Sequence, residues 1–216
     1  MKLNIDFLEN NINLSNDFVC SLEIENKNYF YRIVNILNQY SKGVLQDEIY
    51  ESNIKTKIII DYFNLEQSNK KVITHINKII KNDLNEIDYE QLNKYYQKMI
   101  LKYEEIIKQI DIPLEIDKEF NIDNLSKIFN ISINYQNNIL NNLFTLIDIN
   151  KETKEFDLLV FINLKLYLTK EELKEFYKYV IYNKITILLV DSDSSGVSIE
   201  NEKKIIIDQN LEEFMI

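Results

Sequence analysis

Apolar and polar residues near both ends of the chain recur in short runs that are typical of strands separated by helices. Residues 2–8 alternate in polarity, whereas residues 157–163, DLLVFIN, form the continuous apolar run of a strand covered on both faces. Residues 27–43 have helical spacing, and a further helix begins at Thr169, where Glu172 completes a capping box. The ranges that predict strands are 2–8, 17–25, 55–63, 157–163, 185–190 and 203–208. Strand, helix and strand in this order predict parallel strands with a right-handed crossover.

The middle of the chain, from about residue 67 to residue 148, has a helical period almost throughout. One helix is predicted at about 68–82. A second, at about 89–110, carries an apolar seam with alternating steps of four and three residues, and Pro113 ends it. The seam consists of Leu92, Tyr96, Met99, Tyr103, Ile106 and Ile110.

The order of these patterns defines the expected fold class, which is α/β with a helical insertion. We expect a head domain with a parallel or mixed sheet, formed by residues 1–64 and 150–216. Residues 65–149 are expected to form an α-helical leg domain that interrupts the head.

Composition narrows the possible chemistry. The 216 residues carry a formal net charge of −10, which is unusual for a nucleic-acid-binding protein, although a local lysine stripe can still bind phosphate. Cys20 is the only cysteine, so a thiolate zinc site and a disulfide framework are excluded, and the single histidine, His75, argues against a histidine-based triad. The sequence shows no apolar run of about 20 residues and no signal peptide, and we therefore expect a cytoplasmic protein without a membrane span.

The stretch ITILLVDS, residues 185–192, ends like the metal-binding strand of a P-loop nucleotide hydrolase, with Asp191 in the place of the metal ligand. Such an aspartate functions beside a glycine-rich loop that binds phosphates. The two glycines, Gly43 and Gly196, do not lie in that pattern. This favours a strand-end acid over a catalytic metal ligand.

The predicted helix at 68–82 has one basic face. At about 100° per residue, four lysines fall in one arc, opposite a face of valine and isoleucine. They are Lys70, Lys71, Lys78 and Lys81. The arrangement is compatible with an ordinary solvated face, and also with a stripe that follows a phosphate backbone rather than reading bases. Lys94, Lys98 and Lys102 form a second column on the next helix.

An acidic segment follows at residues 111–123. Its carboxylates at short spacing suit Ca²⁺ or Mg²⁺, although the turn glycine of an EF-hand is absent. The segment is equally compatible with a solvated acidic linker.

These stretches together resemble a known family. The stretch DLLVFINLKLYLTKEELKEFYKYVIYNKITILLVDS is similar to the C-terminal part of the accessory adaptation proteins of type II-A CRISPR systems. KLNIDFLENNINL, the helix with YFYRIVNILNQY, and IIIDYFNLEQSNKKVITHINKII are also similar to that family. The likeness extends over the whole chain and includes the order of its domains.

The resemblance implies a degenerate P-loop-like head, an inserted helical leg and a homotetrameric ring that holds double-stranded DNA ends without catalysis. It implies Ca²⁺ as a cofactor, and spacer acquisition together with the CRISPR integrase pair and the type II effector nuclease. By position, the calcium ligands would be Glu115, Asp117, Glu119 and Asp123. The DNA-binding residues would be Lys70, Lys71, Lys78 and Lys81.

Three hypotheses follow from the sequence. The first is this non-catalytic, sequence-independent DNA-end clamp. The second is a P-loop-type nucleotide hydrolase, motivated by ITILLVDS. The third is a purely structural protein-interaction module built around the seam at 92–110.

Overall fold

The computed structural model describes residues 1–3, 5, 8, 11–42, 54–65, 69–121, 129, 131–193 and 199–216, with the side chains of residues 69–71 also outside the description. The chain forms two compact units. The head unit contains Met1–Leu65 and Tyr135–Ile216, and the insertion unit contains Glu66–Asn134.

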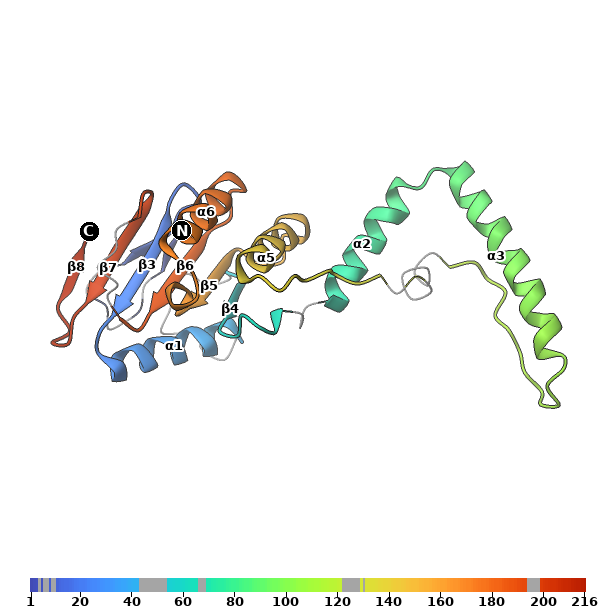
Figure 1. Ribbon diagram of the computed structural model, residues 1–216, viewed down its shortest axis with the longest axis horizontal. Coiled ribbons are helices and arrows are strands. Elements are labelled where there is room, and N and C mark those ends of the chain that lie inside the picture. The colour runs from blue at the N-terminus through green and yellow to red at the C-terminus, as the bar shows by residue number, and fades with distance from the viewer. Residues whose placement is uncertain are drawn as a thin grey trace. The chain divides into compact units, whose positions relative to one another are not determined.

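The head unit is built on a six-stranded sheet in the order β4-β5-β6-β3-β7-β8 (Figure 1). All neighbouring strands are parallel except β7 and β8, so the sheet is mixed, as the sequence predicts. The strands are β3 (Val19–Ile24), β4 (Thr56–Ile59), β5 (Leu158–Ile162), β6 (Ile187–Asp191), β7 (Glu202–Ile207) and β8 (Glu213–Met215). A separate antiparallel pair is formed by β1 (Lys2–Leu3) and β2 (Ile12–Asn13).

Helices cover both faces of this sheet. On one face α1 (Lys27–Ser41) packs through Ile33, Ile36 and Leu37 against even-numbered residues of β3, β5 and β6. On the other face α5 (Ile139–Thr153) and α6 (Lys170–Tyr182) pack against the odd-numbered residues of β5 and β6. Figure 1 shows α1 and the α5/α6 pair on opposite sides of the strands. This double covering explains why β5 and β6 are apolar without alternation.

The crossover between β5 and β6 is formed by a short 3₁₀ helix, η3 (Leu164–Leu166), and then by α6. The predicted capping box is present at the start of α6. Thr169 Oγ1 accepts from the Glu172 backbone N–H at 3.3 Å, and the Glu172 carboxylate accepts from the Thr169 backbone N–H at 2.8 Å. The predicted parallel pairing of β5 with β6 is confirmed.

The insertion unit ends at Asn134, whereas we expected it to end at residue 149. The helix α5 belongs to the head unit, because Leu140, Leu143, Leu146 and Ile147 are buried in its core. Helical periodicity is the same in a head helix as in a leg helix, so the pattern alone cannot assign α5 to either unit.

The insertion unit contains α2 (Asn69–Asp83) and α3 (Glu86–Ile107), which confirms the two predicted helices. A segment after α3 returns along it, because Gln97 donates to the Lys118 carbonyl at 3.0 Å and the Phe120 ring packs against Tyr89 and Tyr96. The helical pattern at 121–131 falls mostly on residues outside the described ones. None of the described helices has the length and apolar character of a membrane span.

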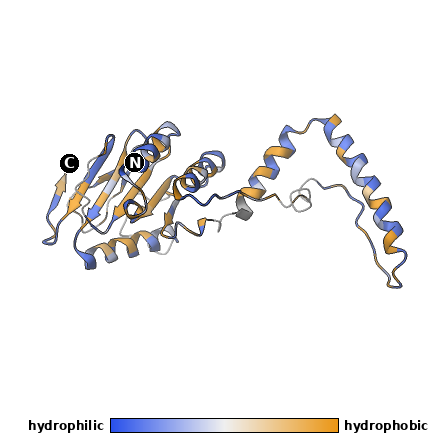
Figure 2. Cartoon of the chain, viewed as in Figure 1, coloured by the Kyte–Doolittle hydropathy of each residue, from blue (hydrophilic) through white to orange (hydrophobic). Residues whose placement is uncertain are grey.

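The predicted seam of α3 is mostly uncovered in the single chain. Met99, Tyr103 and Ile106 are more than half exposed, whereas Ile100, one residue beside the seam, is buried. Figure 2 shows hydrophobic residues recurring along both α2 and α3. The insertion unit therefore presents apolar surface that this chain does not bury within the described residues.

Candidate nucleic-acid interface and buried ion-pair cluster

The basic face of α2 is the first candidate site. Lys78 and Lys81 are exposed, while Val72 on the opposite side of the helix is buried. No ion pair between described residues involves Lys78 or Lys81, and the first acid in the helix is Asp83, its last residue. The backbone of Lys70 and Lys71 lies in the same helix, but their side chains are outside the described part of the structure.

The second lysine column, on α3, is largely compensated by neighbouring groups. Lys94 lies 3.9 Å from Glu90, and Lys102 lies 2.7 Å from Glu105. The Lys98 ammonium lies 6.0 Å from the centre of the Tyr95 ring. Among the described side chains, the positive charges of Lys78 and Lys81 on α2 are therefore less offset than those of the α3 column.

The acidic segment does not gather its carboxylates among the described residues. Glu115, Asp117 and Glu119 are all exposed, and Asp117 Oδ1 accepts a hydrogen bond from the Glu119 backbone N–H at 3.0 Å. Asp123 lies outside the described residues. Across the described ranges, no three acids, histidines or cysteines lie together as a metal site requires, so these residues alone do not form a calcium site.

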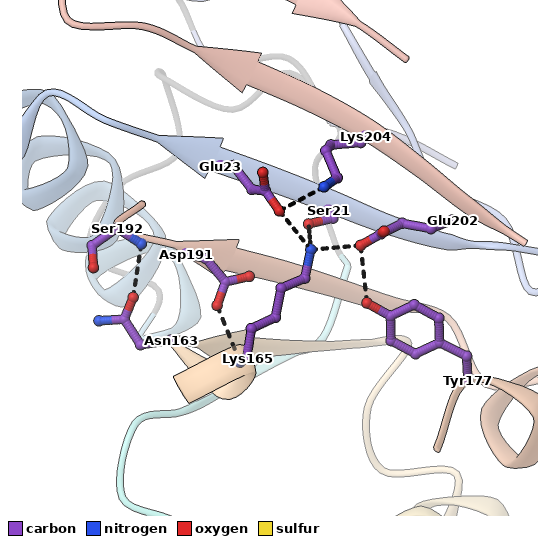
Figure 3. A network of polar contacts seen from close by, with 9 residues as sticks. All are labelled: Ser21, Glu23, Asn163, Lys165, Tyr177, Asp191, Ser192, Glu202 and Lys204. Atoms are coloured by element: carbon purple, nitrogen blue, oxygen red, sulfur yellow. Dashed lines mark hydrogen bonds and ion pairs between the residues drawn. The ribbon is translucent and has the colours of Figure 1, made fainter. Parts of the chain in front are cut away.

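The most organised polar arrangement is a buried cluster on the α6 side of the head sheet, centred on Lys165 of η3 (Figure 3). The Lys165 ammonium donates to Ser21 Oγ and Glu23 Oε1, both at 2.8 Å, and to Glu202 Oε1 at 2.6 Å. These three bonds use all three N–H donors of the ammonium. Lys204 lies 2.9 Å from the same Glu23 oxygen, and the side chains of Lys165, Glu23 and Glu202 are 7%, 0% and 2% exposed.

Two further groups complete the cluster. Tyr177 of α6 donates to Glu202 Oε1 at 2.9 Å, and Asp191 Oδ1 accepts from the Lys165 backbone N–H at 3.3 Å. Asp191 Oδ2 and Glu202 Oε2 are buried and contact no hydrogen-bond donor within the described part of the chain. Three carboxylates thus face two ammonium groups, which leaves one formal negative charge when all are ionised.

Burial and ion pairing act in opposite directions on these groups. Burial alone would raise the pKa of Glu23, but hydrogen bonds from Lys165 and Lys204 hold it below its usual value. Burial alone would lower the pKa of Lys165, but the carboxylates of Glu202 and Glu23 raise it. For Asp191 burial dominates and raises the pKa to about 6. Burial raises the pKa of Tyr177, and the negative charge of Glu202 raises it further.

Asp191 lies at the end of β6, beside Glu23 of β3. A P-loop would occupy the turn between β3 and α1. That turn consists of Glu25 and Asn26, and the Asn26 side chain caps α1 by accepting from the Tyr29 backbone N–H at 3.1 Å. The turn lacks both glycine and a phosphate-binding lysine, which argues against the nucleotide hydrolase hypothesis.

The sequence reasoning singled out Asp191 but missed Lys165, Glu23 and Glu202. A signal was present, because Ser21 and Glu23 interrupt the apolar run of a strand that is wholly buried. Charged residues are rarely buried unless they are paired. Nothing in the pattern indicated Lys165 as the partner, which is 142 residues away from Glu23 in the sequence.

The fold and its two units define the class of this protein as an α/β head with an inserted helical unit. A family model described as CRISPR-associated protein (Cas_Csn2) matches residues 38–211. This match covers more than half of the chain, and the chain therefore belongs to that family of CRISPR-associated proteins.

A solved structure supports the fold. Stu0660 of Streptococcus thermophilus superimposes with a TM-score of 0.58 at 14% sequence identity. The match covers 100% of this chain and 76% of that one. No curated protein matches the chain in sequence.

We predict that Lys165→Met lowers the free energy of unfolding by about 3–5 kcal/mol, because it leaves buried carboxylates without their main counter-charge. Chemical denaturation measures the effect. Lys174→Met, at an exposed position of α6, removes the same charge and is expected to change stability by less than about 0.5 kcal/mol. Equal effects of the two substitutions would contradict the role of the cluster.

We predict that Asp191→Asn stabilises the protein above pH 6 and has little effect near pH 4. The folded-state pKa of Asp191 is raised, from 3.8 to about 6, so its stabilising contribution is full at low pH and is lost as the pH rises through 6. An Asn cannot ionise, and the gain is at most about 3 kcal/mol. Denaturation between pH 4 and pH 8 tests this, with the exposed Asp193→Asn as the control. Parallel pH profiles for parent and Asp191→Asn would contradict the prediction.

Proposed function

We propose that this protein binds double-stranded DNA ends independently of sequence, as a non-catalytic homotetrameric ring that assists spacer acquisition in CRISPR immunity. Membership of the CRISPR-associated family supports the setting. The observation that carries the DNA-binding part is the basic face of α2, where Lys78 and Lys81 are exposed and unpaired among the described residues. In this proposal the CRISPR integrase pair and the type II effector nuclease are the protein partners.

The chemistry of this face favours phosphate over bases. Lysine carries a flexible point charge without the planar fork with which arginine reads guanine, and Arg32 is the only arginine of the chain. Contacts of this kind give affinity that does not depend on sequence and that falls steeply with salt. Such a protein suits DNA fragments of any sequence.

The negative net charge of −10 does not oppose this proposal. Interactions between exposed charges are largely screened beyond about 10 Å at 0.1 M salt, so the local surface decides phosphate binding. In α2 every charged residue before Asp83 is a lysine. In the head, by contrast, the buried acids Glu23 and Glu202 are already paired with lysines.

The ring is supported by the exposed apolar seam of α3. Met99, Tyr103 and Ile106 follow one another by steps of four and three residues and are each more than half exposed. Contiguous apolar surface of this kind marks protein–protein contact. We propose a second copy of this chain as the partner of the seam, because a closed ring requires contacts between copies.

Calcium remains an expectation drawn from the resemblance. Glu115, Asp117 and Glu119 supply the hard oxygen ligands that Ca²⁺ prefers, but as described they are exposed and not gathered. Our proposal therefore treats Ca²⁺ as a condition to be tested, and the proposed contacts between α2 and DNA do not require it.

We predict that reversing Lys78 and Lys81 together to glutamate weakens binding of linear duplex DNA at least tenfold at about 0.1 M salt. The slope of log affinity against log salt is expected to fall by about 1–2, because each lost phosphate contact contributes about 0.9 to it. Fluorescence anisotropy with labelled duplexes of two unrelated sequences measures both quantities. Adding Lys70→Glu and Lys71→Glu is expected to weaken binding further.

A matched control is Lys174→Glu with Lys178→Glu, at two exposed positions of α6 in the head. It makes the same change in net charge, so it separates a local interface from a general electrostatic effect. Equal losses in the two double variants would contradict an α2 interface. Equal affinity for linear and closed-circular duplex would contradict recognition of ends.

We predict that Met99→Glu with Ile106→Lys lowers the oligomeric state without changing the helical content. A charge pair of opposite sign leaves net charge unchanged and prevents burial of the seam. Light scattering, with and without Ca²⁺, measures the mass. A strictly monomeric parent under both conditions would contradict the ring, whereas an oligomer that binds no DNA would favour the interaction-module hypothesis.

A further inference from the structure

A cavity of about 390 Å³ opens at the edge of the head sheet where the parallel strands β5 and β6 begin. It lies at the opposite edge of the sheet from Asp191, the last residue of β6. Helices α5 and α6 end beside it, and the Lys151 ammonium of α5 joins them by donating to Asn183 Oδ1 at 3.0 Å. The residues that line the cavity differ from those of the buried ion-pair cluster around Lys165.

Two lysines of the cavity lie on turns of fixed conformation. Lys154 directly follows α5 and Lys184 lies two residues after the end of α6, and both are left-handed, with φ of 48° and 56°. This conformation favours glycine, because a Cβ atom crowds the following carbonyl oxygen. The buried Asn150 side chain holds the first turn by bonding the carbonyl and the N–H of Phe156 at 3.0 and 3.1 Å. The chain thus places a lysine, rather than the favoured glycine, at both turns beside one cavity.

The walls of the cavity are positively charged. Three lysines and one acid, Asp157, line it, and their three positive charges and one negative charge leave a formal charge of +2. The carbonyl ends of α5 and α6 offset part of this charge, at about half a charge each. Within the described chain, the Lys154 ammonium contacts no hydrogen-bond or ion-pair partner. Lys184 lies 2.8 Å from Asp17, but both side chains are more than half exposed, and such pairs contribute little. Lys154 and Lys184 are therefore accessible to an anionic ligand.

We propose that this cavity binds a phosphate monoester, such as the 5′-phosphate of a nucleotide. A monoester carries close to two negative charges at neutral pH, and lysine ammonium groups bind phosphate as point charges. The half-buried Thr186 hydroxyl, which has no hydrogen-bond partner within the described residues, is a further donor. Phe156 and Ile185, both half-buried, form an apolar wall against which the carbon part of the ester packs. The site belongs to the head and does not depend on the contacts between α2 and DNA proposed above.

Calorimetric titration of the full chain with thymidine 5′-monophosphate, and with thymidine as the ligand that lacks the phosphate, tests the proposal. The monophosphate is expected to bind at least about tenfold more tightly than thymidine, because only the monophosphate is charged. Lys154→Gly with Lys184→Gly removes both ammonium groups at positions where glycine is favoured, so the fold is expected to persist and the affinity to fall at least about tenfold. Asp17→Asn frees Lys184 and is expected to raise the affinity about two- to fivefold.

The matched control is Lys174→Met with Lys178→Met on α6, which makes the same change in net charge away from the cavity and is expected to leave the affinity unchanged. Equal affinity of the parent for thymidine and for its monophosphate would overturn the proposal, whether or not the variants fold. An undiminished affinity of the folded glycine variant, or an equal loss in the control, would also overturn it.

Two blunt DNA duplexes, with and without 5′-phosphates, separate the two sources of the phosphate monoester, which are a free nucleotide and a DNA end. They are titrated into Lys78→Glu with Lys81→Glu, which removes the proposed α2 contacts. Tighter binding of the phosphorylated duplex that is lost on adding Lys154→Gly and Lys184→Gly assigns the DNA end, whereas equal binding of both duplexes leaves the free nucleotide as the ligand. Either outcome supports the site once the monophosphate binds. Failure of the α2 interface is distinguished from failure of this site, because different pairs of lysines are changed.

Discussion

The bonds of the Lys165 ammonium to Glu23 and Glu202 join the connection between β5 and α6 to two neighbouring strands of the sheet. Lys165 belongs to η3, between β5 and α6, whereas Glu23 lies in β3 and Glu202 in β7. All three side chains are buried. In the protein interior an ion pair is strong, and a charge without its partner is very unfavourable. A single charged group therefore ties the connection that carries α6 to the paired strands β3 and β7.

The two units use their charges in different ways. The head buries its cluster, in which two lysines and Tyr177 lie against the carboxylates of Glu23 and Glu202. The insertion unit keeps its charges exposed, with lysines on α2 and acids on the segment after α3. Exposed charges contribute little to stability but are available to partners. This contrast is why the proposed DNA contacts lie in the insertion unit, and why the head is expected to provide shape and stability.

The sequence predicted most elements because their apolar periods are clear. The runs at 157–163 and 185–190 correspond to β5 and β6, and Thr169 with Glu172 marked the start of α6 correctly. Assignment of α5 to the leg was wrong, since the same helical period serves a helix in either unit. The basic face of α2 was predictable from helical geometry alone, whereas the cluster at Lys165 was not.

The sequence by itself determined the fold class, the helical insertion and the position of the lysines along α2. These properties follow from the spacing of apolar and polar residues within each segment, which can be read without knowing how the segments pack together. Only the tertiary structure decided that Asp191 faces a lysine rather than a phosphate-binding loop, because the cluster joins residues from β3, η3, α6, β6 and β7. Contacts between residues more than a hundred positions apart depend on the strand order and on which residues of each strand face α6. Neither the strand order nor the facing of the residues can be predicted from the pattern of any single segment.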